Sequence, residues 1–327
     1  METSLPETYK ILLPQGPGKI PKYESKPLPK PGKNEVLVKI AFAPINPMEL
    51  SLLYTGAPTV NYGIEGSGTV VAIGENLNIP HKIGDKVHVY GPGTYAEYLV
   101  LASDKCYPIQ GDLSLERAAS HIVNPGTVVF MGHLVEKGGH KAAIISAGNS
   151  AVGRMAIRYF KQKGIKLISI VRRDDFNEEM KKDGVDHILN STAPDFDAKL
   201  KEIAEKENAT ISFDGLCGDF PGKLLKAQPP GSVCYLYGAV AGELEVKGIN
   251  VFDVLKGNKI VGLNLYHYVD EKTKAGELRQ FFHEVHSQLA TTLSSEVVKV
   301  FTLDKLEEAI AFSNQNRSKG KVLLKPN

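Results

Sequence analysis

One stretch constrains the fold of this chain more than any other: an apolar run, a glycine turn and a helical pattern follow one another directly. The apolar run, residues 141–146, is suited to a buried strand. The turn spans residues 148–153, and the helical pattern continues to about Gly164. A second apolar run occupies residues 166–171. This order predicts the βαβ unit that binds dinucleotides, with the turn at the N-terminus of the helix.

The residues after the second apolar run indicate which dinucleotide is bound. An NAD site places an acidic ribose ligand about 20 residues past the turn, and there this chain has Arg172 and Arg173. Two guanidinium groups suit a 2′-phosphate, so the sequence predicts NADPH as the cofactor. Asp174 and Asp175 are the alternative ribose ligands. We interpret Asp175 instead as a helix cap, because Glu178 follows at capping-box spacing.

The glycine pattern itself is incomplete. Gly148 and Gly153 fill the first and third positions of G-x-G-x-x-G, but Ser150 replaces the glycine that lets the backbone approach the pyrophosphate. The Ser150 hydroxyl and the helix N-terminal amides can still donate to phosphate. The alternative is a glycine turn in an α/β protein that binds no dinucleotide, with Arg172 and Arg173 as a solvated pair.

The composition argues against several classes of function. A net charge of +2 without a dense basic cluster argues against nucleic-acid binding. Three widely spaced cysteines argue against a disulfide framework and a structural zinc lobe. No apolar run approaches the ~18 residues of a membrane span, and the first ten residues lack the apolar core of a secretory signal. We therefore expect a soluble protein of a reducing compartment, the cytoplasm, with the mitochondrion as the alternative.

The chain contains two kinds of sequence. Its first third has many Pro and Gly residues between short β-like runs, which predicts a compact β domain. The middle alternates strand and helix patterns, which predicts a parallel sheet with helices on both faces. The tail has a last strand pattern at residues 321–324 and is expected to return to the β domain. We predict an α/β protein with a β-rich domain at residues 1–119 and 266–327 and a dinucleotide-binding domain at residues 120–265.

Four short segments occur in a fixed order along the chain: Gly63-Ile64-Glu65-Gly66-Ser67-Gly68, Gly84-Asp85-Lys86-Val87, Gly93-Thr94-Tyr95-Ala96-Glu97-Tyr98 and Gly320-Lys321-Val322-Leu323. In this order they resemble the medium-chain dehydrogenase/reductase superfamily over nearly the whole chain. The resemblance implies a GroES-like β-rich catalytic domain interrupted by a Rossmann doubly wound parallel-sheet domain that binds NADPH.

The resemblance also implies that the catalytic site lacks zinc. Asn46-Pro47 stands where the family has its first zinc cysteine, or the Asn-Pro that replaces it. Ile64 replaces the His of the family's G-H-E segment, and isoleucine has no lone pair to give a metal. We therefore expect no metal and no polarisation of a substrate oxygen by zinc.

Within the zinc-lacking branch, two subfamilies compete. The 149–153 turn, the strand end at residues 171–174 and the 123–127 segment resemble 2-enoyl thioester reductases, whereas the 95–98 segment resembles quinone oxidoreductases. The enoyl reductases carry a catalytic tyrosine just after the glycine that follows the Asn-Pro segment. Here that glycine is Gly56, followed by Ala57 and Pro58. Tyr54 and Tyr62 are the nearest substitutes, and a half-buried surface tyrosine is the alternative interpretation of each.

The resemblance implies a zinc-independent, NADPH-dependent reductase of an activated C=C bond in an enone or 2-enoyl thioester. An NADPH:quinone reductase, which needs no dedicated proton donor, and a catalytically inactive dinucleotide-binding subunit are the alternatives. A homodimer is expected through a strand at residues 259–265. The expected catalytic residues are Tyr62, Tyr54 and Asn46. The expected cofactor-binding residues are Asn124, Thr127, Gly148, Asn149, Ser150, Ala151, Val152, Gly153, Arg172, Arg173, Tyr237, Gly238, Leu263, Asn264 and Leu265.

Overall fold

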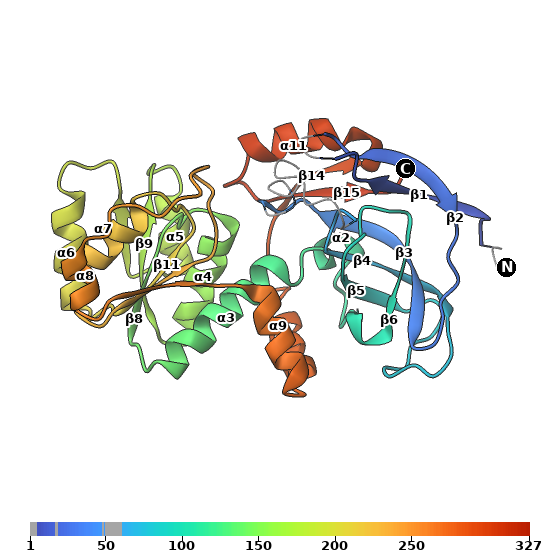
Figure 1. Ribbon diagram of the computed structural model, residues 1–327, viewed down its shortest axis with the longest axis horizontal. Coiled ribbons are helices and arrows are strands. Elements are labelled where there is room, and N and C mark those ends of the chain that lie inside the picture. Colours follow the sequence, from blue (N-terminus) through green and yellow to red (C-terminus); the bar gives the residue numbers. More distant parts are fainter. Residues whose placement is uncertain (1–4, 17–18, 48, 50–60) are drawn as a thin grey trace. The chain divides into compact units, whose positions relative to one another are not determined.

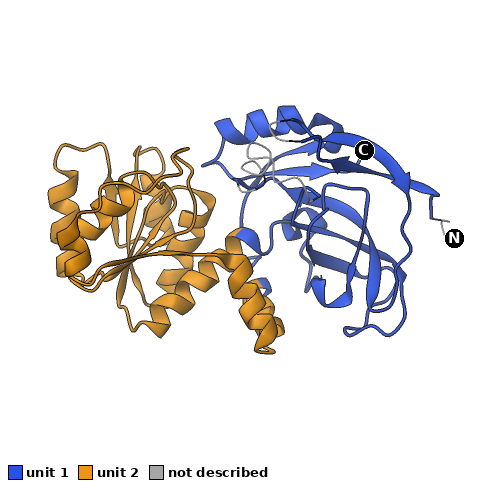
Figure 2. Cartoon of the chain, in the orientation of Figure 1, with its two compact units in different colours: residues 1–123, 286–327 blue, residues 124–285 orange. Residues whose placement is uncertain are grey.

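The computed structural model describes residues 5–16, 19–47, 49 and 61–327. Contacts within the chain divide it into two compact units (Figure 2). Unit 1 comprises residues 1–123 and 286–327, and unit 2 comprises residues 124–285. Unit 1 is therefore discontinuous in sequence and contains both ends of the chain.

Unit 2 is built on a six-stranded parallel sheet (Figure 1). Its strand order is β10-β9-β8-β11-β12-β13. This is the strand order of a doubly wound Rossmann sheet. After β10 the next strand, β11, is added on the other side of β8, so the order in which strands are added reverses between β8 and β11. The expected α/β fold with a Rossmann sheet is confirmed. The strands are β8 (Ala142–Ile145), β9 (Lys166–Val171), β10 (His187–Asn190), β11 (Ile211–Asp214), β12 (Val233–Leu236) and β13 (Lys259–Gly262).

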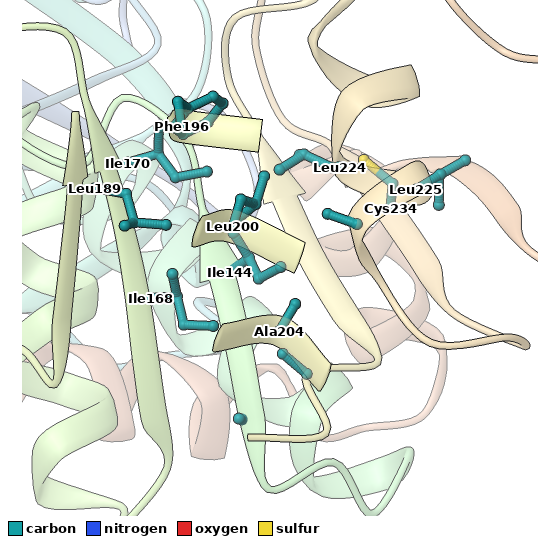
Figure 3. Packing of buried hydrophobic residues seen from close by; sticks show 13 residues of the cluster. Ile144, Ile168, Ile170, Leu189, Phe196, Leu200, Ala204, Leu224, Leu225 and Cys234 are labelled. Atoms are coloured by element: carbon teal, nitrogen blue, oxygen red, sulfur yellow. The ribbon is translucent and has the colours of Figure 1, made fainter. Parts of the chain in front are cut away.

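Helices bury both faces of this sheet. Ile144 and Ile168 pack against Leu200 of α6 in a buried cluster (Figure 3). Ile145 and Leu167 alternate with these residues along the strands and are equally buried, so the opposite face is covered too. The helices with most or all of their residues in this unit are α3 (Val123–Lys137), α4 (Ala151–Gln162), α5 (Asn177–Asp183), α6 (Phe196–Lys206), α7 (Phe220–Ala227), α8 (Val251–Leu255), α9 (Leu265–Lys274) and α10 (Leu278–His286).

Unit 1 is built mainly on antiparallel strands, and only β14 and β15 pair in parallel among its described strands. Its main sheet has the order β14-β15-β3-β4-β5-β7, and β6 also pairs with β3, while β1 and β2 form a separate pair. Val36, Val38 and Ile40 alternate along β3 and face a buried aliphatic cluster, as expected for a strand with one face in the core. The elements are β1 (Thr8–Leu13), β2 (Lys22–Pro27), β3 (Glu35–Pro44), β4 (Glu65–Ile73), β5 (Lys86–Tyr90), β6 (Tyr98–Ala102), β7 (Cys106–Pro108), β14 (Val297–Thr302), β15 (Lys321–Lys325), α2 (Leu115–Ala118), α11 (Leu306–Gln315) and the 3-10 turns η1 (Ser103–Lys105) and η2 (Leu303–Lys305).

The boundaries of the two units differ from the expected domain boundaries at 119/120 and 265/266. Residues 266–285 group with unit 2 because α9 and α10 pack on α3. The rings of Phe130 and Tyr268 stack with centroids 3.8 Å apart, and His133 Nε2 lies 2.9 Å from Glu284 Oε2. In the part of the chain that the structure describes, no helix combines the length and apolar character that crossing a membrane requires.

Candidate functional site

The turn between β8 and α4 has the close backbone packing that its glycines suggest. A Cβ on Gly148 would lie 1.8 Å from Ser169 Oγ, and one on Gly153 would lie 2.3 Å from the Gly148 carbonyl oxygen. Ala147 adopts a left-handed conformation, with φ of 52°, which turns the chain from strand to helix. Gly148 and Gly153 are therefore required by space rather than by their own φ angles.

Ser150 replaces the middle glycine without backbone strain. Its φ is −73°, and its Oγ accepts a hydrogen bond of 3.1 Å from Gly153 N–H as the N-cap of α4. The hydroxyl is thus engaged with the helix. The first amides of α4, at Ala151 and Val152, have no acceptor four residues earlier within the helix, and such groups attract phosphate.

Arg172 and Arg173 follow β9 and are both exposed. The Arg173 guanidinium pairs weakly with Asp175, at 3.5 Å. Asp174 accepts hydrogen bonds from the side-chain amides of Asn177 (3.0 Å) and Asn190 (2.9 Å). One alternative ribose ligand therefore organises its own loop, while the two cationic side chains reach solvent.

The expected cap at Asp175 is wrong. Helix α5 begins at Asn177, its N-cap is Phe176, and no side chain caps it. Asn177 N–H instead donates to the Asp174 carbonyl, at 3.1 Å. The loop after β9 is held by Asp174 rather than by a capping box.

A polar cluster that we did not predict lies at the reversal point of the sheet. Ser146, directly after β8, donates from Oγ to Asp214 Oδ1 at 2.5 Å, and its Oγ accepts from Gly215 N–H at 2.8 Å. Tyr237 donates to the Ser146 carbonyl at 3.0 Å. Burial raises the pKa of Asp214. The sequence signal was available, because a polar residue directly follows β8 and another ends β11, the two strands that flank the reversal point.

The remaining expected cofactor residues follow other strands or begin helices of unit 2. Asn124 and Thr127 lie buried in the first turn of α3, and Tyr237 and Gly238 directly follow β12. Because the sheet is parallel, the segments after β8, β9, β12 and β13 all leave the sheet at the carboxyl ends of its strands. The structure thus places the residues we proposed after these four strands at the same end of the sheet.

The strand expected at residues 259–265 is shorter than predicted. β13 ends at Gly262, and Leu263 is buried just beyond it. Asn264 is the N-cap of α9, accepting from Tyr266 N–H (3.0 Å) and His267 N–H (3.2 Å), and Leu265 is the first helical residue. An asparagine cap before a helical pattern overrides the apolar run that suggested continued strand.

In unit 1, Asn46 belongs to a buried hydrogen-bonded network. Asn46 is fully buried, its Nδ2 donates to Glu65 Oε1 at 2.9 Å, and its Oδ1 accepts from Lys321 Nζ. Glu65 Oε2 accepts three backbone N–H bonds, from residues 121, 122 and 123. The Asn46 side chain, which we expected to be catalytic, is engaged at both its oxygen and its nitrogen.

Glu49 and Lys321 complete this network. Glu49 Oε2 accepts from Asn46 N–H at 2.5 Å, and burial raises the pKa of Glu49 to about 8. Burial lowers the pKa of Lys321. Both shifts have one cause, the loss of water around a charge. The Gly320-Lys321 segment is one of the segments that carry the family resemblance, but nothing in the sequence shows that it meets Glu49.

The two candidate tyrosines have different outcomes. Tyr54 lies outside the described residues. Tyr62 is buried in an apolar cluster with Leu12, Ile45 and Tyr95, and burial raises its pKa. Tyr95 donates to the Pro44 carbonyl at 3.1 Å. Burial is the main cause that raises the pKa of Tyr95, and the nearby Glu49 is the second. Tyr62 is therefore a core side chain within its unit, which leaves its role in proton transfer a prediction.

Comparison with known families matches both units. The profile described as "Alcohol dehydrogenase GroES-like domain" matches residues 32–111, and the one described as "Zinc-binding dehydrogenase" matches residues 151–282.

The relatives are reductases. A mitochondrial enoyl-[acyl-carrier-protein] reductase of Caenorhabditis elegans is 28% identical over 69% of this chain and 68% of its own length. A 2-haloacrylate reductase of Burkholderia is 22% identical over 84% of this chain and 83% of its own length. Among solved structures, a candidate NADPH:quinone reductase of Mesorhizobium loti has a TM-score of 0.83 and 26% identity, with 99% of this chain and 100% of that chain covered.

Proposed function

Since the chain belongs to the medium-chain dehydrogenase/reductase superfamily, we propose that it is a zinc-independent, NADPH-dependent reductase of an activated carbon–carbon double bond. The substrate class is an enone or a 2-enoyl thioester. One observation carries the proposal: the tightly packed glycine turn before α4 stands beside β9, which is directly followed by two exposed arginines. Together they suit a dinucleotide with an additional phosphate.

The residues present fit NADPH better than NADH. Asp174, the acid nearest the expected ribose position, is occupied by two asparagine amides. Arg172 and Arg173 are exposed and can form bidentate, charge-assisted hydrogen bonds to a 2′-phosphate. The amides at the start of α4 are the proposed partners of the pyrophosphate.

The network around Asn46 supports zinc independence. Ile64 offers no ligand atom at one zinc position, and Asn46 is hydrogen-bonded to Glu65 and Lys321 at the other. The Lys321 ammonium is hydrogen-bonded to Asn46 and interacts with the charge of Glu65, so the Glu65 carboxylate needs no divalent cation to balance it. We propose Asn46 as a residue that positions Lys321 and Glu65.

NADPH, when bound, supplies a hydride to the carbon β to a carbonyl, and negative charge then grows on the carbonyl oxygen. The chain has to stabilise that charge with fixed donors, for which backbone amides or a tyrosine hydroxyl are the candidates. A tyrosine or water then protonates the α carbon. Tyr62 and Tyr54 remain the proposed tyrosines.

Quinone reduction is the second candidate, and the packing of Tyr62 favours it. A quinone accepts hydride without a dedicated proton donor on the protein, and Tyr62 is part of an apolar core. The third candidate, a subunit that binds the dinucleotide without turnover, shares the same cofactor residues.

We also propose a homodimer formed through unit 2. β13 is the last strand in the order of its sheet, so one of its edges has no strand partner among the described residues. Val261 on this strand and Phe252, Val254 and Leu255 on the preceding helix α8 are exposed apolar side chains. Pairing of this edge with its two-fold mate covers both features. Analytical ultracentrifugation of Val261→Lys would give monomer if this is correct.

Activity assays with purified protein distinguish the candidates. Loss of NADPH absorbance with an enone or a 2-enoyl-CoA, and not with a quinone, supports the first proposal; the reverse supports the second. Cofactor binding without turnover on any of them supports the inactive subunit. Turnover that is lost on chelation and restored by zinc contradicts zinc independence. The buried, free cysteines agree with a reducing location, for which we propose the cytoplasm or the mitochondrion.

A further inference from the structure

Three histidines far apart in the sequence meet inside unit 1. His88 lies on β5, His121 precedes α3, and His286 is the last residue of α10. The ring centroids of His88 and His286 are 4.1 Å apart, those of His88 and His121 are 4.7 Å apart, and those of His121 and His286 are 5.1 Å apart. His88 and His121 are buried, and His286 is half-buried. None of them occupies a position that we compared with the zinc ligands of the family.

Backbone carbonyls fix the protonation of two of these rings. His121 Nε2 lies 2.8 Å from the Val89 carbonyl oxygen, and His88 Nδ1 lies 2.9 Å from the Ala118 carbonyl oxygen. A carbonyl only accepts, so each of these nitrogens carries the hydrogen. In the neutral rings His121 Nδ1 and His88 Nε2 therefore carry the lone pairs. This is how a metal-ligating histidine is usually held, with its other ring nitrogen donating to a carbonyl.

The two rings are neutral at ordinary pH. Burial lowers the pKa of His88 to about 3 and that of His121 to about 4. A metal binds the neutral imidazole, so these ligands need no deprotonation before they bind.

The nitrogens are close enough to share an ion. One ring nitrogen from each histidine lies within 4.8 Å of the other two, and His121 Nδ1 is 3.0 Å from His286 Nε2. Tetrahedral zinc with Zn–N bonds of about 2.0–2.1 Å holds its nitrogens about 3.4 Å apart. Because His121 Nδ1 accepts, His286 Nε2 supplies the hydrogen between them. A metal ion can replace the hydrogen between these two nitrogens once that proton has moved to His286 Nδ1.

We propose that His88, His121 and His286 form a zinc site that stabilises unit 1 and takes no part in hydride transfer. Three imidazoles suit zinc, copper or nickel, and we commit to zinc because three histidines with one open position form a common zinc ligand set. Because His286 is only half-buried, water can reach the fourth coordination position of the proposed zinc and complete the tetrahedron. The site ties β5, the residues before α3 and the end of α10 together, so its occupancy raises the resistance of unit 1 to unfolding.

Zinc titration of matched variants tests the proposal. Metal-stripped protein is titrated with zinc against a chromophoric chelator, and the tested variant is His286→Asn, at a half-buried helix end. The control is His283→Asn, an exposed histidine on the same helix. We expect one zinc per chain for the parent and the control, and affinity weaker by about a hundredfold or more for His286→Asn, since even second-shell changes cost 10–100-fold. Absence of zinc binding in the parent, or equal binding by all three proteins, overturns the proposal and leaves a hydrogen-bonded triad.

A second measurement needs no variant and covers the case in which His286→Asn does not fold. In parent protein labelled with ¹⁵N-histidine, zinc is expected to shift the ring nitrogens of three of the nine histidines. No change, or changes confined to other histidines, overturns the site. NADPH oxidation is followed in parallel and is expected to be unchanged by zinc, whereas thermal unfolding moves to higher temperature. If the protein shows no reductase activity in any assay, the proposed function fails but the zinc measurements still decide the metal site.

Discussion

The polar sites of the two units are built from different chemical groups, backbone amides in unit 2 and side chains in unit 1. In unit 2 the turn before α4 presents mainly backbone amides, and Ser150 substitutes for a glycine because its side chain caps the helix. In unit 1 the site consists of buried side chains that are hydrogen-bonded to Asn46. A backbone site tolerates exchange of side chains as long as space remains, whereas a buried network of charges depends on every member.

The largest test of this contrast is Lys321→Met in unit 1. Removing the buried ammonium leaves the Glu65 carboxylate without its cation, and we expect unfolding to become easier by about 3–5 kcal/mol. Urea unfolding followed by circular dichroism measures the change. Lys325→Met is the matched control, because Lys325 lies on the same strand and is exposed. Equal losses in the two variants would contradict the importance of the network.

The paired arginines test unit 2. Arg172→Asp combined with Arg173→Ala is expected to weaken NADPH binding at least tenfold more than NADH binding, since each charge-assisted contact contributes about 1.5–3 kcal/mol. Fluorescence titration with both nucleotides gives the two dissociation constants. Lys182→Ala, an exposed charge on α5, serves as the control. An equal loss for both nucleotides would show that the arginines do not contact the additional phosphate.

Unit 2 also has a side-chain network, formed by Glu284, His133 and Tyr159, and its contribution to stability is expected to depend on pH. The hydrogen bond with His133, together with that from Tyr159, lowers the pKa of Glu284 to about 2. The unfolded carboxyl titrates near 4.5, so the stabilisation is complete above about pH 4.5 and is lost as the pH falls toward 2. Glu284→Gln is expected to cost about 1–2 kcal/mol at neutral pH, after allowance for partial exposure, and to flatten this acid dependence.

Unfolding curves between pH 2 and 7 for the parent, Glu284→Gln and the exposed control Glu271→Gln measure the effect. A parent and a Glu284→Gln variant with the same acid dependence would contradict the assignment.

The smallest effect is expected at Ser150. Ser150→Ala removes the N-cap of α4 and is expected to destabilise the protein by about 1 kcal/mol, whereas Ser150→Gly costs only a few tenths. Thermal unfolding compares the two. If the serine acts only as a cap, neither change alters NADPH affinity strongly; a large loss of affinity in both would mean that the hydroxyl contacts phosphate.

The fold could be predicted where the signal is local. The strand, turn and helix at residues 142–162 are contiguous, so the periodicity and the glycines identify them together. Local competition caused the errors. Asn264 caps a helix inside an apolar run that reads as strand, and Asp174 holds a loop that we assigned to a cap at Asp175.

The sites of unit 1 could be predicted only in part, because their partners are distant in sequence. The resemblance identified Asn46 and Ile64 as replacements for zinc ligands, but nothing in the sequence links Asn46 to Lys321 or His121 to His286. The contact between Asn46 and Lys321 exists only once β3 and β15 have paired. Tyr62 illustrates the same limit, since its burial depends on packing from several segments.

The carboxylate of Glu65 has a consequence for local motion. Three consecutive amides, at His121, Ile122 and Val123, donate to its single Oε2 atom just where α3 begins. A helix usually takes its first acceptor from a neighbouring residue, but here the first residue of β4, more than fifty positions earlier, supplies it. The three protons therefore share one protection factor and exchange with deuterium together, each time that carboxylate releases them.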